Sequence, residues 1–188
     1  MSSTHPSSSP IIHSVHFYDR DEALIQRLRS IVSSAIENGN SALIVASQEH
    51  RRQLSAALAA NGDPRGLEMG GRLTFLDAEE TLSLFMVDGL PDQGRFIASV
   101  GELVKTAKRS AWNGRRGLTV FGEMVAILWE RGNQAGALQL EALWNDLLAD
   151  RAFHLHCAYP RSLFAGAKDS SQIRAICDSH SHVVGAAA

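Results

Sequence analysis

The feature that most constrains the fold of this chain is its regular alternation of short apolar runs with longer amphipathic stretches. The run SALIVAS, at residues 41–47, is continuously apolar, which is typical of a strand buried on both faces of a sheet. Before it, apolar residues recur with the spacing of one helix face from Leu24 to Ile36, and Gly39 follows where that helix should end. Strands that alternate with helices predict an α/β fold with three αβα layers around a mostly parallel central sheet.

The same pattern predicts five strands and the helices that connect them. The strands are expected at residues 11–18, 41–47, 72–77, 117–123 and 153–160. Seven helices are expected. Three have both bounds, at residues 48–60, 133–150 and 170–180. Of the others, three begin at about Arg20, at Pro91 and just after Glu123, and a short one ends at Phe85. Asp19 and Glu22 have the spacing of a capping box for the first helix, and Pro91 is placed to open a later one.

The length of 188 residues predicts a single domain. We expect this domain over residues 11–184, after a disordered Ser/Pro-rich leader at residues 1–10 and before a flexible tail at residues 185–188. No apolar run reaches the roughly 20 residues of a membrane-spanning helix, and the leader lacks the apolar core of a signal peptide. Two cysteines are too few for a disulfide framework, so we expect a cytoplasmic protein with no membrane partner.

The charge of the chain argues against nucleic acid as a direct partner. The formal net charge is −2, which provides no overall attraction to nucleic acid or to an anionic membrane. One local basic cluster is interpreted as a solvated helix end and loop. It comprises Lys105, Lys108, Arg109, Arg115 and Arg116.

The first turn from a strand into a helix lacks a phosphate-binding loop. It reads FYDRDEAL, with no glycine and no Lys-Ser/Thr pair. Asp19, Asp21 and Glu22 occupy the positive end of the helix dipole, where they would repel a triphosphate. The chain is therefore not expected to be a P-loop ATPase, although ligands of α/β domains favour this carboxyl edge of the sheet.

Glu123 is the first candidate for a functional side chain. It follows the fourth predicted strand, next to Gly122, at the carboxyl edge of the sheet. A general base would need a raised pKa and a nearby partner, and the sequence identifies neither. We therefore interpret Glu123 as a buried anchor or a ligand contact rather than as a catalytic residue.

The segment HLHCAYP is the second candidate. In a strand, His154 and His156 point to one face, whereas Cys157 shares the other face with Leu155 and Tyr159. Cys157 is interpreted as a small buried hydrophobe, because no base or helix N-terminus that would activate its thiol is adjacent in sequence. Neither a GxSxG elbow nor an HExxH helix occurs, so the sequence predicts no catalytic residues.

Several histidines raise the question of a metal site. The tail segment ICDSHSH contributes Cys177, His180 and His182, and four further histidines lie in predicted strands: His13, His16, His154 and His156. Zinc would bind only if the fold gathered three or four of these side chains. Because their spacing matches no CxxC or HExxH signature, the sequence predicts neither a metal ion nor another cofactor.

Six segments of the chain, taken in order, resemble one family. They are HSVHFYDRDEALI, ENGNSALIVASQEHRRQL, LTFLDAEETLSLFMVDGLPDQGRF, TVFGEMVAILWERGNQAGALQLEALWNDL, FHLHCAYP and IRAICDSHSHVV. The family is the MEDS domain, a sensory domain named after methanogens, methylotrophs and the dichloromethane-responsive repressor. The resemblance covers residues 12–184, and the string GEMV followed by LExLWN and CAYP is its most specific part.

The resemblance implies a RecA/KaiC-like fold that has lost its phosphate loop, and a role in sensing small organic molecules such as hydrocarbon derivatives. The positions that match the family pattern are His16, Tyr18, Glu123, Glu141, Asn145, Cys157, Tyr159, Cys177 and His180. We expect a ligand site lined by six of them: His16, Tyr18, Glu123, Glu141, Cys157 and Tyr159.

The leading hypothesis is a non-catalytic sensory module that binds a small organic molecule and signals through a histidine kinase or another signalling protein. No helix-turn-helix is recognisable in the sequence, so its output is expected to run through that partner. The turn VDGLPD and the helix after Glu123 are expected to move. One alternative is a docking module without a small ligand, and another is an enzyme that uses Glu123 with Cys157 or a metal. Self-association through an apolar helix face is left open.

Overall fold

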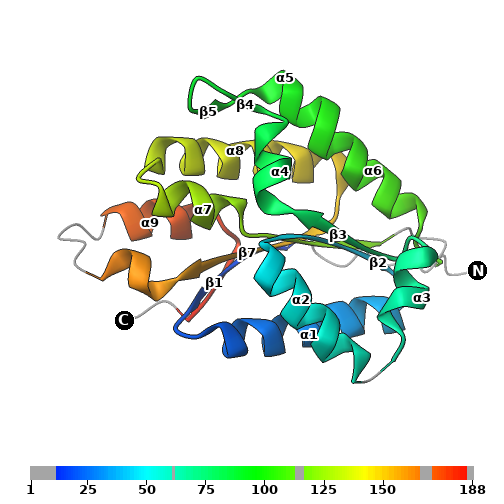
Figure 1. Cartoon of the computed structure of the whole chain (residues 1–188). Coiled ribbons are helices and arrows are strands. Elements are labelled where there is room, and N and C mark those ends of the chain that lie inside the picture. Colours follow the sequence, from blue (N-terminus) through cyan, green and yellow to red (C-terminus); the bar gives the residue numbers. More distant parts are fainter. Residues whose placement is uncertain (1–11, 61, 113–116, 166–170, 186–188) are drawn as a thin grey trace, which may run out of the picture.

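The chain folds around one six-stranded sheet in which all strands run parallel (Figure 1). The computed structural model describes residues 12–60, 62–112, 117–165 and 171–185. The strand order is β3-β2-β6-β7-β1-β8. The strands are β1 (His13–Tyr18), β2 (Ser41–Ala46), β3 (Leu73–Asp77), β6 (Leu118–Gly122), β7 (His154–Pro160) and β8 (His182–Val184). This parallel sheet confirms the predicted fold class.

Helices cover both faces of the sheet and give the three αβα layers (Figure 1). The elements of one layer are α1 (Asp21–Glu37), α2 (Gln48–Ala59) and the short α3 (Pro64–Met69). On the other face lie α4 (Ala78–Ser83), α5 (Gln93–Phe96), the π-helix η1 (Ile97–Gly101), α6 (Glu102–Arg109), α7 (Met124–Glu130), α8 (Gln134–Arg151) and α9 (Ser171–Asp178). A 3-10 turn, η2 (Arg161–Phe164), follows β7.

Each face of the sheet has its own hydrophobic core. Under α1 and α2 the core includes Leu24, Leu28 and Ile44, whereas the larger core under α6, α7 and α8 includes Val104 and Trp144. All six residues of β2 are buried, as expected for a strand covered on both faces. At the end of α1, Gly39 has a φ of 75°, which confirms the predicted glycine stop.

The first helix begins next to its predicted start but without the predicted capping box, and the helix start predicted at Pro91 was wrong. Arg20 is the N-cap residue of α1 and makes no side-chain cap bond, so Asp19 and Glu22 form no capping box. Pro91 lies in a hairpin strand rather than at the start of a helix, because α5 begins only after Asp92, whose Oδ1 accepts the backbone N–H of Arg95 at 2.8 Å.

The turn VDGLPD is a β-hairpin rather than a simple loop. Its strands are β4 (Met86–Val87) and β5 (Leu90–Pro91), which pair antiparallel. Asp88 and Gly89 both have positive φ, as a two-residue hairpin turn requires. The three-residue edge strand β8 was not predicted, because so short a run carries no periodic signal.

Some sequence predictions concern residues outside the described part of the chain. These are the leader at residues 1–10, the last residues of the tail, and Arg115 and Arg116 of the basic cluster. Within the described residues, no helix combines the length and the apolar character that crossing a membrane requires.

The helix caps give a direct test of the fold. Asp77 caps α4, where its Oδ1 accepts the backbone N–H groups of Glu79 and Glu80 at 2.9 and 3.1 Å. We expect Asp77→Ala, which removes this cap and the ion pair of Asp77 with Arg51 at 2.5 Å, to lower the free energy of unfolding by about 1–2 kcal/mol. The matched control is Asp19→Ala, which removes the predicted but unused cap and should cost less than about 0.5 kcal/mol. Urea denaturation measures both, and equal losses would contradict the assigned caps.

Candidate functional site

The carboxyl ends of the central strands bring a group of polar side chains together. Glu123 follows β6 directly and is 6% exposed. Its Oε1 accepts the backbone N–H of Ser47, the N-cap residue of α2, and its Oε2 accepts Nδ1 of His50 at 2.6 Å. These contacts follow from the topology, because β2 and β6 are parallel neighbours and end at the same edge.

His50 links Glu123 to the first strand and helix. Its Nε2 lies 3.5 Å from Oδ1 of Asp21 at the start of α1, and its ring packs edge-on against Tyr18 with the centroids 6.4 Å apart. We refer to Tyr18, Asp21, His50 and Glu123 as the carboxyl-edge cluster. Among the described residues, no side chain hydrogen-bonds to the Tyr18 hydroxyl, which leaves it available to a ligand.

The charges of the cluster shift two of its pKa values. The hydrogen bond to Glu123 raises the pKa of His50, against the opposing effect of burial. Burial, followed by the negative charges of Glu123 and Asp21, raises the pKa of Tyr18, which therefore remains a protonated donor. Because Asp21 and Glu123 bring two carboxylates to this cluster, it favours a neutral or cationic ligand over an anion.

Glu123 also connects the two helical layers. It is the N-cap residue of α7 on one face of the sheet, while its carboxylate holds Ser47 and His50 at the start of α2 on the other. Both carboxylate oxygens are engaged, so Glu123 serves as an anchor between two helices, in agreement with its interpretation from the sequence.

A second group lies inside the larger core and is called here the buried donor cluster: His13, Glu141, Cys157 and His180. Their donor atoms all lie within 4.8 Å of one another. Nε2 of His13 is 3.4 Å from Oε2 of Glu141 and 3.5 Å from Sγ of Cys157, and Nε2 of His180 is also 3.4 Å from Oε2 of Glu141. Glu141 is fully buried.

The surroundings of Glu141 keep its carboxylate charged. Tyr159 donates its hydroxyl to Oε1 of Glu141 at 3.0 Å. Burial alone would raise the pKa of Glu141, but His13, His180 and Tyr159 together lower it. Burial and the neighbouring Glu141 raise the pKa of the Cys157 thiol well above its ordinary value, so Cys157 is no activated nucleophile in this state.

The six residues expected to line one ligand site lie in three different parts of the structure. Tyr18 and Glu123 belong to the carboxyl-edge cluster, whereas Glu141, Cys157 and Tyr159 belong to or touch the buried donor cluster. His16 lies on the α1 face of the sheet and lines a cavity of about 10 Å³ there, which Cys157 also borders. The predicted orientation of β7 is confirmed, because Leu155, Cys157 and Tyr159 share one core.

Asn145 and Cys177, which also match the family pattern, lie near the buried donor cluster and against the larger core, respectively. Asn145 supports His13 from α8, with Oδ1 of Asn145 2.8 Å from Nδ1 of His13. Cys177 is partly buried against the larger core and is not one of the four clustered donors.

Sequence reasoning missed His50 as a site residue, and it named His13 only as one of several histidines that a metal ion would need the fold to gather. His50 could have been found because it follows the end of β2 by one helical turn and so must lie at the carboxyl edge. His13 carried no such signal, because its partners are far away in the sequence.

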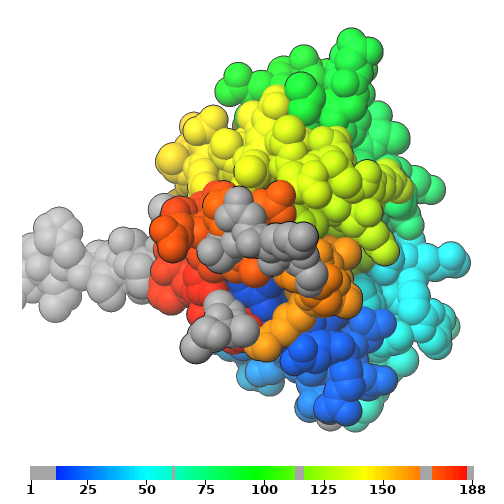
Figure 2. Space-filling view, turned by 90° about the vertical axis from the view of Figure 1, so that its left-hand side faces the viewer, coloured from blue at the N-terminus to red at the C-terminus, as the bar shows by residue number. Residues whose placement is uncertain are grey.

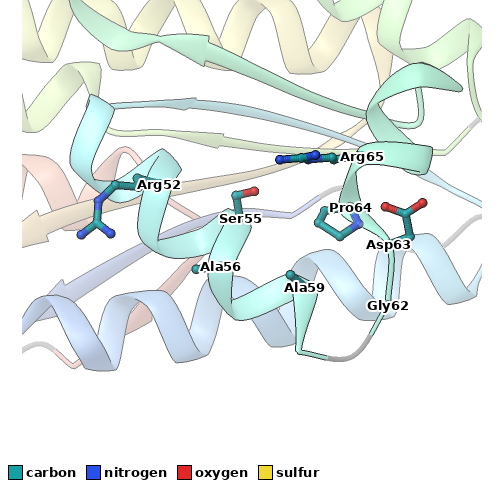
Figure 3. A pocket seen from close by; sticks show the side chains of 8 residues that line it. All are labelled: Arg52, Ser55, Ala56, Ala59, Gly62, Asp63, Pro64 and Arg65. Atoms are coloured by element: carbon teal, nitrogen blue, oxygen red, sulfur yellow. The ribbon is translucent and has the colours of Figure 1, made fainter.

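An open hollow of about 580 Å³ lies between α2 and α3, away from both clusters (Figure 3). Its lining is formed by Arg52, Ser55, Ala56, Ala59, Gly62, Asp63, Pro64 and Arg65. None of the expected ligand residues contributes to it, so it gives no support to a ligand site there.

Fold and clusters together define an α/β domain with polar sites at its sheet edge and in its core, and without a phosphate loop. Comparison with protein families identifies its class: residues 12–181 match the family described as MEDS, the methanogen/methylotroph, DcmR sensory domain. Because the match spans most of the chain, the protein belongs to the MEDS family of sensory domains. No curated protein matches the chain.

The ion pair at the carboxyl edge has a measurable titration. We expect NMR to show the pKa of His50 above its ordinary value of about 6.5, and Glu123→Gln to lower it. The internal control is His156, whose pKa burial lowers to about 4 and which Glu123→Gln should leave unchanged. The stability that protonated His50 contributes is complete below about pH 6.5 and is lost as the pH rises through its raised pKa. An unchanged His50 pKa in the variant would contradict the assigned bond.

The two cysteines should differ in reactivity. Cys157 is 1% exposed and hydrogen-bonded within the core, whereas Cys177 is only partly buried. In the native protein we expect a thiol reagent to modify Cys177 first, and Cys177→Ala to remove most of the rapid labelling. Labelling in denaturant, where both thiols react, serves as the control. Rapid native labelling of Cys157 in the Cys177→Ala variant would show that the core is open.

Proposed function

We propose that this protein is a non-catalytic sensory module that binds a small organic molecule at its carboxyl-edge cluster and signals through a partner protein. Membership of the MEDS family supports the sensory role. The observation that carries the proposal is the position of Glu123, which joins the starts of α2 and α7 across the sheet edge. A ligand that alters this junction acts on both helical layers at once.

The chemistry of the cluster favours a neutral ligand with a hydroxyl or carbonyl group. Tyr18 offers a protonated hydroxyl, and His50 offers a ring whose hydrogen bond to Glu123 and contact with Asp21 a ligand could replace. The carboxylates disfavour an anion. An oxygenated hydrocarbon derivative fits these requirements.

The two segments expected to move are linked through the start of α8. Asn133, which follows α7 and caps α8, donates its Nδ2 to the carbonyl of Gly89 in the hairpin turn at 2.6 Å. Gln139 of α8 donates to the carbonyl of Pro91 at 2.7 Å. A displacement of α7 that begins at Glu123 therefore reaches the β4–β5 hairpin. Ligand binding shifts the equilibrium only if one arrangement binds it more tightly.

The segment that would transmit this change carries exposed apolar side chains. Leu84, Leu90 and Ile97 are 53%, 43% and 38% exposed, and all belong to the stretch between α4 and η1. We propose this stretch as the contact for a histidine kinase or another signalling protein. Direct contact with nucleic acid or with a membrane is not part of the proposal, because the net charge of −2 provides no attraction to either.

Several features support a role without catalysis. Both oxygens of Glu123 are held by hydrogen bonds from α2, and the Cys157 thiol has a raised pKa. A general base needs a carboxylate oxygen that is free to accept a proton, and a thiolate nucleophile needs a lowered thiol pKa.

Native mass spectrometry of the protein as purified tests the proposal. We expect a small organic molecule that is released on denaturation, and a loss of at least about tenfold in its occupancy in Tyr18→Phe, since this change removes a polar contact worth about 1.4 kcal/mol or more. Glu123→Gln should also lower the occupancy, because it weakens the junction with Ser47 and His50 that the ligand is proposed to act on. The matched control is Glu102→Gln, an exposed glutamate paired with Lys105 on α6.

Two outcomes would contradict ligand binding at this edge. One is a wild-type protein with the plain polypeptide mass, which would favour a docking module instead. The other is a bound molecule whose occupancy is the same in Glu123→Gln as in Glu102→Gln.

A further inference from the structure

We propose that the buried donor cluster is a binding site for one divalent transition-metal ion, with zinc as the best geometric match. The four donors are two imidazole nitrogens, one thiol sulfur and one carboxylate oxygen. Zinc binds this mixture of N, S and O ligands, and structural zinc sites have four protein ligands in a tetrahedron.

The distances between the donors fit such a tetrahedron. With metal–ligand bonds of about 2.0–2.3 Å, the edges of a tetrahedral site are roughly 3.3–3.7 Å long. The donor atom of Glu141 lies 3.4 Å from that of His13, 3.4 Å from that of His180 and 3.7 Å from that of Cys157. The edge from His13 to Cys157 is 3.5 Å. Four of the edges thus already have the required length.

The hydrogen bonds behind His13 orient its free nitrogen toward this centre. Nδ2 of Asn145 donates to the carbonyl of Ser179 at 3.0 Å, which leaves Oδ1 of Asn145 to face Nδ1 of His13. Nδ1 of His13 therefore carries the proton, and Nε2 presents a lone pair when the ring is neutral. An imidazole whose second nitrogen is held in this way is typical of metal ligands.

His180 shows the same arrangement and adds an unsatisfied atom. Its Nδ1 donates to the carbonyl of Ile176 at 2.7 Å, so its Nε2 is an acceptor when the ring is neutral. The side chain of His180 is fully buried, and its Nε2 has no hydrogen bond although it lies 3.4 Å from Oε2 of Glu141. Two acceptors that face each other at this distance require a proton or a cation between them.

A divalent ion would also balance the charge of the core. When a metal binds, Cys157 loses its proton, and the thiolate and the Glu141 carboxylate together neutralise a charge of two. The remaining oxygen of Glu141 keeps the hydroxyl of Tyr159 as a donor at 3.0 Å. Buried ionised groups are normally paired or coordinated to metal.

The proposed ion would join parts of the chain that meet only in the folded state. His13 lies in β1, Glu141 in α8 and Cys157 in β7, whereas His180 lies between α9 and β8. Figure 2 shows this C-terminal segment, orange to red, at the surface between α8 and the N-terminal elements. Because four protein ligands leave no open position, the site would hold the C-terminal segment on the sheet rather than catalyse a reaction.

Cobalt titration of the chelator-treated, reduced protein tests the proposal. We expect one Co²⁺ per chain, with visible bands of tetrahedral cobalt and a thiolate charge-transfer band, and displacement of the cobalt by zinc. Cys157→Ala should abolish the charge-transfer band, and Cys177→Ala should retain it. His180→Gln should weaken binding by more than about 100-fold, beyond the usual cost of second-shell changes. The exposed neighbour His182→Gln is its control.

Circular dichroism tests whether each variant is folded. If Cys157→Ala does not fold, the cobalt spectrum of the wild-type protein alone decides whether the cluster binds a metal through a thiolate. A wild-type protein that binds no cobalt, or binds it without a charge-transfer band, would overturn the proposal. Equal loss in Cys157→Ala and Cys177→Ala would overturn it as well. This site is separate from the carboxyl-edge cluster, so metal binding and organic-ligand binding fail or succeed independently.

Discussion

The parallel pairing of four central strands is the constraint on which the rest of the structure depends. β2, β6, β7 and β1 are neighbours in that order, so their carboxyl ends meet at one edge and their alternate residues face two separate cores. The first consequence places Glu123 beside the start of α2. The second places the Cys157 side chain in the larger core with Tyr159, whereas His16 is not part of that core. Both clusters therefore follow from the register of the sheet rather than from local motifs.

The architecture was predictable because buried positions in helices and strands are apolar residues at regular spacings in the sequence. The continuous run of β2 and the helical spacing of α1 gave the right elements, and Gly39 marked the right helix end. Helix starts were less predictable, since a capping pattern such as Asp19 with Glu22 competes with other contacts. In the structure Asp19 lies near Arg161, with Oδ1 and Nε 3.7 Å apart, and caps nothing.

The candidate sites were only partly predictable, because their side chains come from distant segments. The edge positions of Glu123 and His50 follow from their places after two strands, but their contact requires β2 and β6 to be neighbours in the sheet, which the pattern does not fix. His13 and Cys157 gather with Glu141 only once the strand order is known, since β1 and β7 are paired across most of the chain. A motif search looks for short spacings and has no means of finding such a group.

The pairing of β8 with β1 joins the two ends of the described chain. Ser181 and His13 are joined by three hydrogen bonds, across a separation of 168 residues. Contacts this far apart in sequence form late in folding, because the loop they close must first be ordered. The buried donor cluster is therefore complete only when the whole domain has been synthesised and folded. A truncated or partly folded chain would have a sheet and a carboxyl edge, yet it would lack the fourth donor.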